Sequence, residues 1–299
     1  MPVNRPAAIA AALGIALLAA GAIAQPRPRA DGARTARVAP AIKTIAYGAD
    51  PLQQLDNYPA SSKAAPLVVF VHGGGWKRGD KQMMRGSAKL DHWHGEGYAV
   101  ASLNYRLVPA ARVEDQAADI AAAVAMLKRQ AGALGFDPDR VVLVGHSAGA
   151  HLVALVGTDP QWLRGAGLGM NAIRGVIPLD GAGYHVPSQM GENARVLGDT
   201  YEQAFGTDQA RQLALSPTEH AAGPNAPAFL ILHVSGRADA KRQSERLAQA
   251  LRRAGTPAQL HAVAGRGLMG HMEINRRLGD PAYPATPIVD DGLKRMFAR

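Results

Sequence analysis

The stretch that decides the fold runs from Val141 to Gly149 and reads Val-Val-Leu-Val-Gly-His-Ser-Ala-Gly. Its apolar start, without polar alternation, predicts a strand buried on both faces, as in a parallel sheet. The Ala-, Leu- and Val-rich segment that follows predicts a helix. Glycines around Ser147 allow a tight strand-to-helix turn that lifts the serine hydroxyl above the sheet, and the helix N-terminus favours negative charge developing there. The pattern therefore predicts a nucleophile elbow with Ser147 as the nucleophile.

Apolar runs of the same kind recur along the chain, and stretches with helical spacing separate them. Strands are expected over 67–71, 99–103, 141–144, 176–179, 229–234 and 258–264. Helical stripes are expected over 113–127 and 240–251, the second followed by Gly255 as a C-terminal cap. This alternation predicts an α/β domain with a mostly parallel, doubly wound sheet and right-handed crossovers.

A second glycine motif, His72 to Trp76, directly follows the run 67–71. Consecutive glycines let backbone N–H groups turn inward without obstruction by side chains, and two such donors can stabilise a tetrahedral oxyanion. The alternative is a mobile glycine loop with a tryptophan that only packs. Its place at a strand end, upstream of the elbow, favours the functional interpretation.

Four motifs together resemble the α/β-hydrolase superfamily: His72 to Trp76, Gly79 to Lys81, Asn104 to Leu107 and Gly145 to Gly149. Within it the chain is most similar to the hormone-sensitive-lipase-like and the feruloyl-esterase and kynurenine-formamidase-like carboxylesterases. The resemblance implies an α/β-hydrolase fold over residues 41–299 and the hydrolysis of carboxylic esters through an acyl-enzyme.

The resemblance also implies the oxyanion hole. Its donors would be the N–H group of Ala148 together with those of Gly74 and Gly75. Which glycine of Gly73 to Gly75 donates stays open at the level of sequence.

A triad also needs a base and an acid, and chain order in this fold is serine, then acid, then histidine. The acid is expected after the next-to-last strand, where Asp239 follows the run 229–234. The base is expected after the last strand, where His271 ends a glycine-rich loop, as the family also implies. Asp180, which closes the run 176–179, is the competing acid; we expect it to hold the following segment by hydrogen bonds.

That following segment, about 180–227, has no strong period and is inserted between two core strands. We expect a small helical cap over Ser147 that shapes the acyl or alcohol pocket. The alternative is a structural insertion that does not contact the substrate. Acyl and alcohol specificity therefore cannot be predicted.

The N-terminus has the pattern of an export signal. Arg5 precedes an uncharged run from Ala7 to Ala24, and the small residues Ala22 to Ala24 suit a signal peptidase. We expect a signal peptide over 1–24, a disordered linker over 25–40, and a periplasmic or secreted protein. An uncleaved anchor is the alternative, but the composition is only weakly hydrophobic, so no stable membrane insertion is expected.

Composition excludes several kinds of chemistry. The chain of 299 residues has no cysteine, so it contains neither disulfides nor thiolate metal sites. Its net charge of +9 is scattered and only 5% of residues are aromatic, which argues against nucleic-acid binding. His92 and His94 lack a third ligand nearby, and the glycine-rich segment 165–169 follows no strand. We therefore expect neither a metal nor a cofactor.

These observations predict a serine ester hydrolase that acts on a small-molecule ester. Amide chemistry on the same triad, by an arylformamidase, another amidase or a peptidase, is the first alternative, because the sequence does not separate ester from formamide substrates. A non-catalytic binding protein is the second, although a binding scaffold needs no complete set of serine, aspartate, histidine and glycine donors. The oligomeric state is not predicted.

Overall fold

A computed structural model describes residues 42–193 and 199–299 of the chain. The expected signal peptide over 1–24 and linker over 25–40 lie outside the described residues. The stretch Pro40–Arg299 forms one compact unit. Within the described ranges, no helix is both long and apolar enough to cross a membrane.

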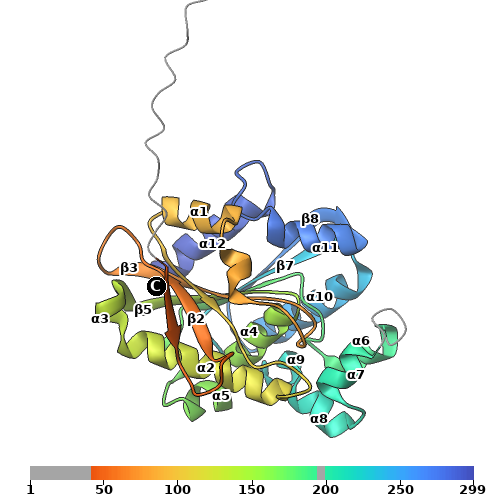
Figure 1. The fold of residues 1–299 in the computed structure, drawn as a ribbon. Coiled ribbons are helices and arrows are strands. Elements are labelled where there is room, and N and C mark those ends of the chain that lie inside the picture. Colours follow the sequence, from red (N-terminus) through yellow and green to blue (C-terminus); the bar gives the residue numbers. More distant parts are fainter. Residues whose placement is uncertain (1–41, 194–198) are drawn as a thin grey trace, which may run out of the picture. The chain divides into compact units, whose positions relative to one another are not determined.

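One mixed sheet forms the centre of this unit (Figure 1). Its strands are β1 (Lys43–Ala46), β2 (Gln54–Tyr58), β3 (Ala65–Val71), β4 (Ala99–Leu103), β5 (Phe136–His146), β6 (Gly175–Leu179), β7 (Phe229–Gly236) and β8 (Ala258–Arg266). They are arranged in the order β1-β2-β4-β3-β5-β6-β7-β8. All pairs from β4 to β8 are parallel, whereas β1 pairs with β2, and β2 with β4, antiparallel. The predicted doubly wound, mostly parallel sheet is confirmed.

Helices cover both faces of the sheet. One face carries α2 (Val113–Arg129), α3 (Ala131–Leu134), α4 (Ala148–Thr158), α5 (Pro160–Gly165) and α10 (Ala238–Arg253). The other face carries α1 (Ala88–Gly95), α11 (Gly267–Arg276) and α12 (Ala285–Phe297). Two short 3₁₀ turns, η1 (Lys81–Met84) and η2 (Met170–Ala172), lie in the connections.

The apolar core is divided by the sheet into two clusters, because alternate strand side chains point to opposite faces. In β3, Val69 packs toward α2 and α4, and Phe70 packs toward α1. Both side chains are buried. Continuous apolar runs are the sequence pattern of such two-sided burial, which explains why the central strands could be recognised.

The edge strands β1 and β2 were not predicted from sequence. They are short and polar, and β2 includes Gln54, Asp56 and Asn57. Asp56 is buried, and it accepts hydrogen bonds from Thr44 Oγ1 at 2.7 Å and from Arg85 Nη2 at 2.7 Å. Paired polar side chains rather than an apolar run hold this edge.

Parallel register brings the functional loops together. Val71 of β3 lies opposite Gly145 of β5, and His146 of β5 lies opposite Leu179 of β6. The carboxyl ends of β3, β5 and β6 therefore meet at one edge of the sheet, where open α/β sheets place their ligands.

Between β6 and β7 the chain leaves the sheet. The described part of this insertion contains α6 (Val186–Asn193), α7 (Thr200–Phe205), α8 (Gln209–Ala214) and α9 (Pro217–His220). Figure 1 shows α6, α7 and α8 together beside the strand ends. The described part of this segment is helical, and its role as a cap stays a prediction.

Candidate active site

Ser147 occupies a sharp turn between β5 and α4. Its backbone has φ 58° and ψ −120°, a region that residues other than glycine rarely adopt. The N–H group of Ser147 donates to the carbonyl of Leu179 at 3.1 Å, which ties the turn to the end of β6. A side chain at Gly149 would place its Cβ 2.2 Å from the carbonyl oxygen of Val71. The second glycine of the motif is therefore required because α4 packs directly against the end of β3.

The glycine loop after β3 lies beside this turn. Gly74 has φ +126°, and a Cβ there would lie 2.0 Å from the carbonyl oxygen of Arg78. Tyr105 donates its hydroxyl to the carbonyl of His72 at 3.0 Å, and the two rings stack. Asn104 Nδ2 donates to Asp80 Oδ2 at 2.9 Å. The other motif residues thus hold the loop in place.

The residues predicted to supply the oxyanion hole lie beside Ser147. Gly74, Gly75 and Ala148 all line one pocket with Ser147. Among the described contacts, the N–H groups of these residues donate no hydrogen bond. Ala148 is the first residue of α4, where backbone donors have no partner within the helix. The predicted oxyanion donors are therefore available, and their role stays a prediction.

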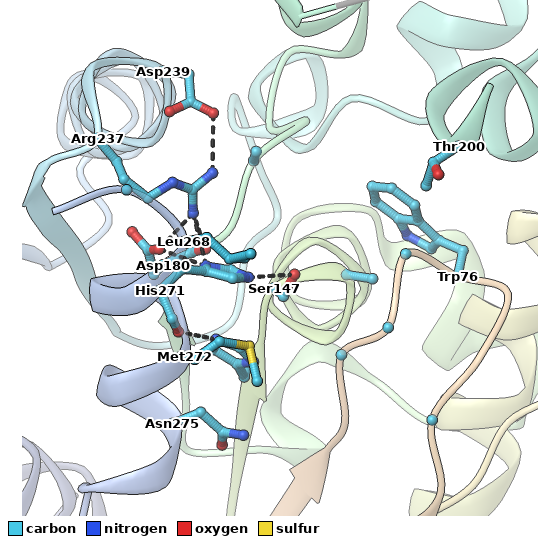
Figure 2. Close-up of a pocket in the computed structure, with 18 of the residues that line it drawn as sticks. Trp76, Ser147, Asp180, Thr200, Arg237, Asp239, Leu268, His271, Met272 and Asn275 are labelled. Carbon is cyan, nitrogen blue, oxygen red and sulfur yellow. Dashed lines mark hydrogen bonds and ion pairs between the residues drawn. The ribbon is translucent and has the colours of Figure 1, made fainter. Parts of the chain in front are cut away.

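His271 contacts both a serine and a carboxylate. Ser147 Oγ lies 3.0 Å from His271 Nε2, and Asp180 Oδ2 lies 2.6 Å from His271 Nδ1 (Figure 2). Ser147 directly follows β5, Asp180 directly follows β6, and His271 lies in the first half of α11. The chain thus joins a hydroxyl, an imidazole and a carboxylate in one line of hydrogen bonds.

The acid next to His271 is Asp180, which corrects the assignment of Asp239. Asp239 lies in the first turn of α10, where its Oδ2 accepts from Arg237 Nη2 at 3.0 Å. Arg237 itself lies between Asp239 and Asp180 (Figure 2). β7 ends at Gly236 and α10 begins directly afterwards, so the chain turns before a carboxylate could reach Nδ1.

Asp180 is a buried carboxylate held from several sides. Its side chain is fully buried, and Val234 N–H donates to Oδ1 at 2.8 Å. Burial alone would raise the pKa of Asp180, but the hydrogen bond from His271 and the charge of Arg237 outweigh it and lower the pKa to about 2. Asp180 is therefore ionised at neutral pH and accepts an N–H from the imidazole.

A signal for Asp180 exists in the sequence, because it closes the strand next to the elbow strand. Sequence reasoning could not use it without the pairing of His146 with Leu179, which puts the two strand ends side by side. Asp180 also has φ 46°, a left-handed conformation that aspartate tolerates better than most residues.

His146, the residue before Ser147, supports the histidine loop. Its Nε2 lies 2.8 Å from the carbonyl oxygen of His271. Burial lowers the pKa of His146 to about 3, and the nearby charge of His271 acts in the same direction. The ring is therefore neutral and donates from Nε2, so the elbow strand itself positions α11.

A pocket of about 870 Å³ opens above Ser147. One wall comes from Trp76 and from Thr200 and Tyr201 of α7, and the opposite wall comes from Leu268 and Met272 of α11 (Figure 2). Part of the insertion therefore lines the pocket. Figure 2 shows Trp76 and Thr200 across Ser147 from His271.

The histidines considered as metal ligands have another contact. His92 Nε2 lies 2.9 Å from Asp290 Oδ2, which joins α1 to α12. Within the described residues, no group of three or more histidine, aspartate or glutamate side chains could hold a metal ion.

Solved structures share this architecture. Esterase B from Lactobacillus rhamnosis superimposes with a TM-score of 0.68 at 24% identity, covering 86% of this chain and 85% of that one. A truncated carbohydrate esterase from gut microbiota superimposes with a TM-score of 0.68 at 19% identity, covering 86% and 95%. The protein has the α/β-hydrolase fold.

Sequence comparisons match part of the chain. Residues 55–165 match the BD-FAE family. Esterase LipC of Mycobacterium tuberculosis is 33% identical over 126 residues, which are 40% of this chain and 31% of that protein. The probable isoprenylcysteine alpha-carbonyl methylesterase ICMEL2 of Arabidopsis thaliana is 38% identical over 112 residues, 37% of this chain and 26% of that protein. The chain thus spans about a third or less of the length of these relatives.

Proposed function

We propose that this α/β-hydrolase is a serine carboxylic ester hydrolase with Ser147 as nucleophile, His271 as base and Asp180 as acid. The line of contacts from Ser147 Oγ through His271 to Asp180 carries the proposal, because it has the order of groups that activates a serine. Curated relatives that bear the name esterase support it, and so does the pocket above Ser147.

The mechanism follows from these contacts. His271 Nε2 accepts the hydroxyl proton as Ser147 Oγ attacks the ester carbonyl carbon. Asp180 accepts the hydrogen bond from Nδ1–H of His271 and stabilises the imidazolium that forms. The imidazolium then protonates the leaving alcohol as the C–O bond breaks, which leaves an acyl group on Ser147. Water gives a proton to His271 as it attacks the acyl carbon. His271 then returns that proton to Ser147 Oγ as the acyl–oxygen bond breaks and the acid is released.

Negative charge on the tetrahedral oxygen needs donors that are in place before the reaction. In this proposal the N–H groups of Gly74, Gly75 and Ala148 supply them. The positive end of α4 points to the same region. The relative contribution of each glycine can be measured only by comparing variants.

The decisive experiment removes the nucleophile. Ser147→Ala is expected to fold and to lose hydrolysis of p-nitrophenyl butyrate by a factor on the order of 10⁶ in kcat. A fluorophosphonate probe is expected to label the wild-type protein at Ser147 and to leave the variant unlabelled. Ser61→Ala, an exposed serine before β3, is the matched control and keeps full activity. Retention of a tenth of the activity by Ser147→Ala would refute the proposal.

We further propose that the protein is exported to the periplasm or beyond. The support is Arg5, the uncharged run Ala7 to Ala24 and the small residues before Gln25.

A further inference from the structure

An arginine is built into the triad. Arg237 Nη1 lies 2.5 Å from Asp180 Oδ2 and 2.7 Å from His271 Nδ1. With the 2.6 Å contact between Nδ1 and Oδ2, these atoms form a closed triangle. The Arg237 side chain is 15% exposed. A cation therefore lies against both the acid and the base.

This cation opposes the working state of His271. The base needs a proton on Nδ1 and a free Nε2, so Nδ1–H and the guanidinium both donate to one carboxylate oxygen. In the other neutral tautomer, Nδ1 has no proton and accepts a hydrogen bond from Arg237. The proton then lies on Nε2, which faces Ser147. A histidine with Nε2 protonated cannot accept the serine proton. The positive charge also disfavours the imidazolium that catalysis forms.

Asp239 contacts the other end of the same guanidinium. Its Oδ2 lies 3.0 Å from Arg237 Nη2, and Gln189 Nε2 donates to that oxygen at 3.4 Å. Figure 2 shows Asp239 and Asp180 on opposite sides of Arg237. Asp239 thus offsets part of the charge of Arg237 and holds the Nη2 end of its guanidinium.

We propose that Arg237 and Asp239 are a pair of positioning residues that set the protonation of the triad: Arg237 orients the Asp180 carboxylate, and Asp239 keeps Arg237 from suppressing the base. The inference rests on the proposed function. It predicts that the loss of kcat caused by Asp239→Asn occurs only when Arg237 is present.

Other charged and titratable groups surround this cluster and are kept constant in the test. They come from β5, α7, α1, the loop before α12 and the start of the insertion. They are His146, Tyr201, Lys89, Tyr283 and Tyr184.

The experiment is a double-mutant cycle on ester hydrolysis. Asp239→Asn is expected to lower kcat about tenfold with little change in KM, because the uncompensated arginine weakens the base. Arg237→Gln is expected to lower kcat at high pH about fivefold, because the Asp180 carboxylate loses the contact that orients it. In the Arg237→Gln background, Asp239→Asn is expected to change kcat by less than about twofold.

The pH profile gives a second readout that a purely structural role would not move. Without Asp239 the imidazolium is less stable, so the acid limb of kcat/KM moves to lower pH by about one unit. Without Arg237 the imidazolium is more stable, and the limb moves to higher pH by a similar amount. Arg237→Lys keeps the positive charge, so its limb stays near that of wild type.

Circular dichroism and melting temperature establish that each variant is folded, and Arg246→Gln on the same helix is the control for loss of one surface charge. Equal losses from Asp239→Asn in both backgrounds, or acid limbs that do not move in opposite directions, would overturn the inference. If Arg237→Gln does not fold, the Asp239→Asn variant alone provides the test. An acid limb of kcat/KM at the wild-type pH in that variant then overturns the inference. Activity in Ser147→Ala would instead refute the proposed function, so the two failures are distinguishable.

Discussion

Asp180 is the residue at which the structure differs from the expectation drawn from the sequence, because it contacts His271 where Asp239 was expected. It directly follows β6, its carboxylate is buried, and its Oδ2 lies 2.6 Å from His271 Nδ1. The backbone of Asp180 has φ 46°, so a test substitution must tolerate that conformation. Asparagine does so, whereas alanine would add backbone strain to the loss of the carboxylate.

We expect Asp180→Asn to lower kcat by a factor on the order of 10⁴, because the amide holds the wrong imidazole tautomer, as in serine proteases. Asp239→Asn should lower it only about tenfold, since Asp239 acts through Arg237. Turnover of both purified variants on the same ester measures the difference. A near wild-type rate for folded Asp180→Asn, with collapse for Asp239→Asn, would restore Asp239 as the acid.

At the scale of elements, α4 links the elbow to the insertion through His151. Trp76 Nε1 donates to His151 Nδ1 at 3.3 Å, so Nε2 carries the proton and donates to the carbonyl of Leu215 at 2.9 Å. The neutral ring satisfies both contacts. A second proton would face the Trp76 donor inside a fully buried site.

We therefore expect the protein to lose stability in mild acid. Burial lowers the pKa of His151 to about 4, partly offset by the Leu215 carbonyl. Above pH 6.5 folded and unfolded states are both neutral at this ring. As pH falls from 6.5 toward 4, only the unfolded state gains a proton, so stability is lost. Between pH 6.5 and 5 the contribution to the free energy of unfolding falls by about 1.5 kcal/mol.

Urea unfolding of wild type and His151→Gln at pH 6.5 and pH 5 measures this contribution. The decrease should be about 1.5 kcal/mol smaller in His151→Gln. His146, also buried with a lowered pKa, contributes in the same direction and stays present in both proteins. His220→Gln, a partly exposed histidine on α9, is the control. Equal decreases in wild type and His151→Gln would contradict this explanation.

At the scale of the whole molecule, we expect the N-terminal segment to direct export of the protein. If residues 1–24 are a signal peptide, the exported protein begins at Gln25 or within a few residues of it. N-terminal sequencing of the exported material tests this directly. Ala24→Phe should block cleavage and accumulate a longer precursor, because the peptidase accepts only small residues there. An intact Met1 on exported wild-type protein would contradict the prediction.

The sequence by itself determined the α/β class, the central strands and the position of the elbow. These depend on neighbours along the chain: apolar runs indicate two-sided burial, and the glycines around Ser147 permit close packing of α4 on β3. Ser147 and His271 could be paired in advance because each follows a strand whose end faces the same edge. The edge strand β1 and its neighbour β2 could not be found, since the antiparallel pairing of β1 with β2 and of β2 with β4, rather than an apolar pattern, defines them.

Only the tertiary structure decided which carboxylate meets His271. Asp180 and Asp239 both follow strands of the same parallel sheet, so their positions in the sequence do not separate them. The choice depends on a residue between them in space: Arg237 binds both carboxylates and leaves Asp180 on the side of the imidazole. Local sequence encodes strands and turns, but the direction of a side chain across a strand end is set by the partners that surround it.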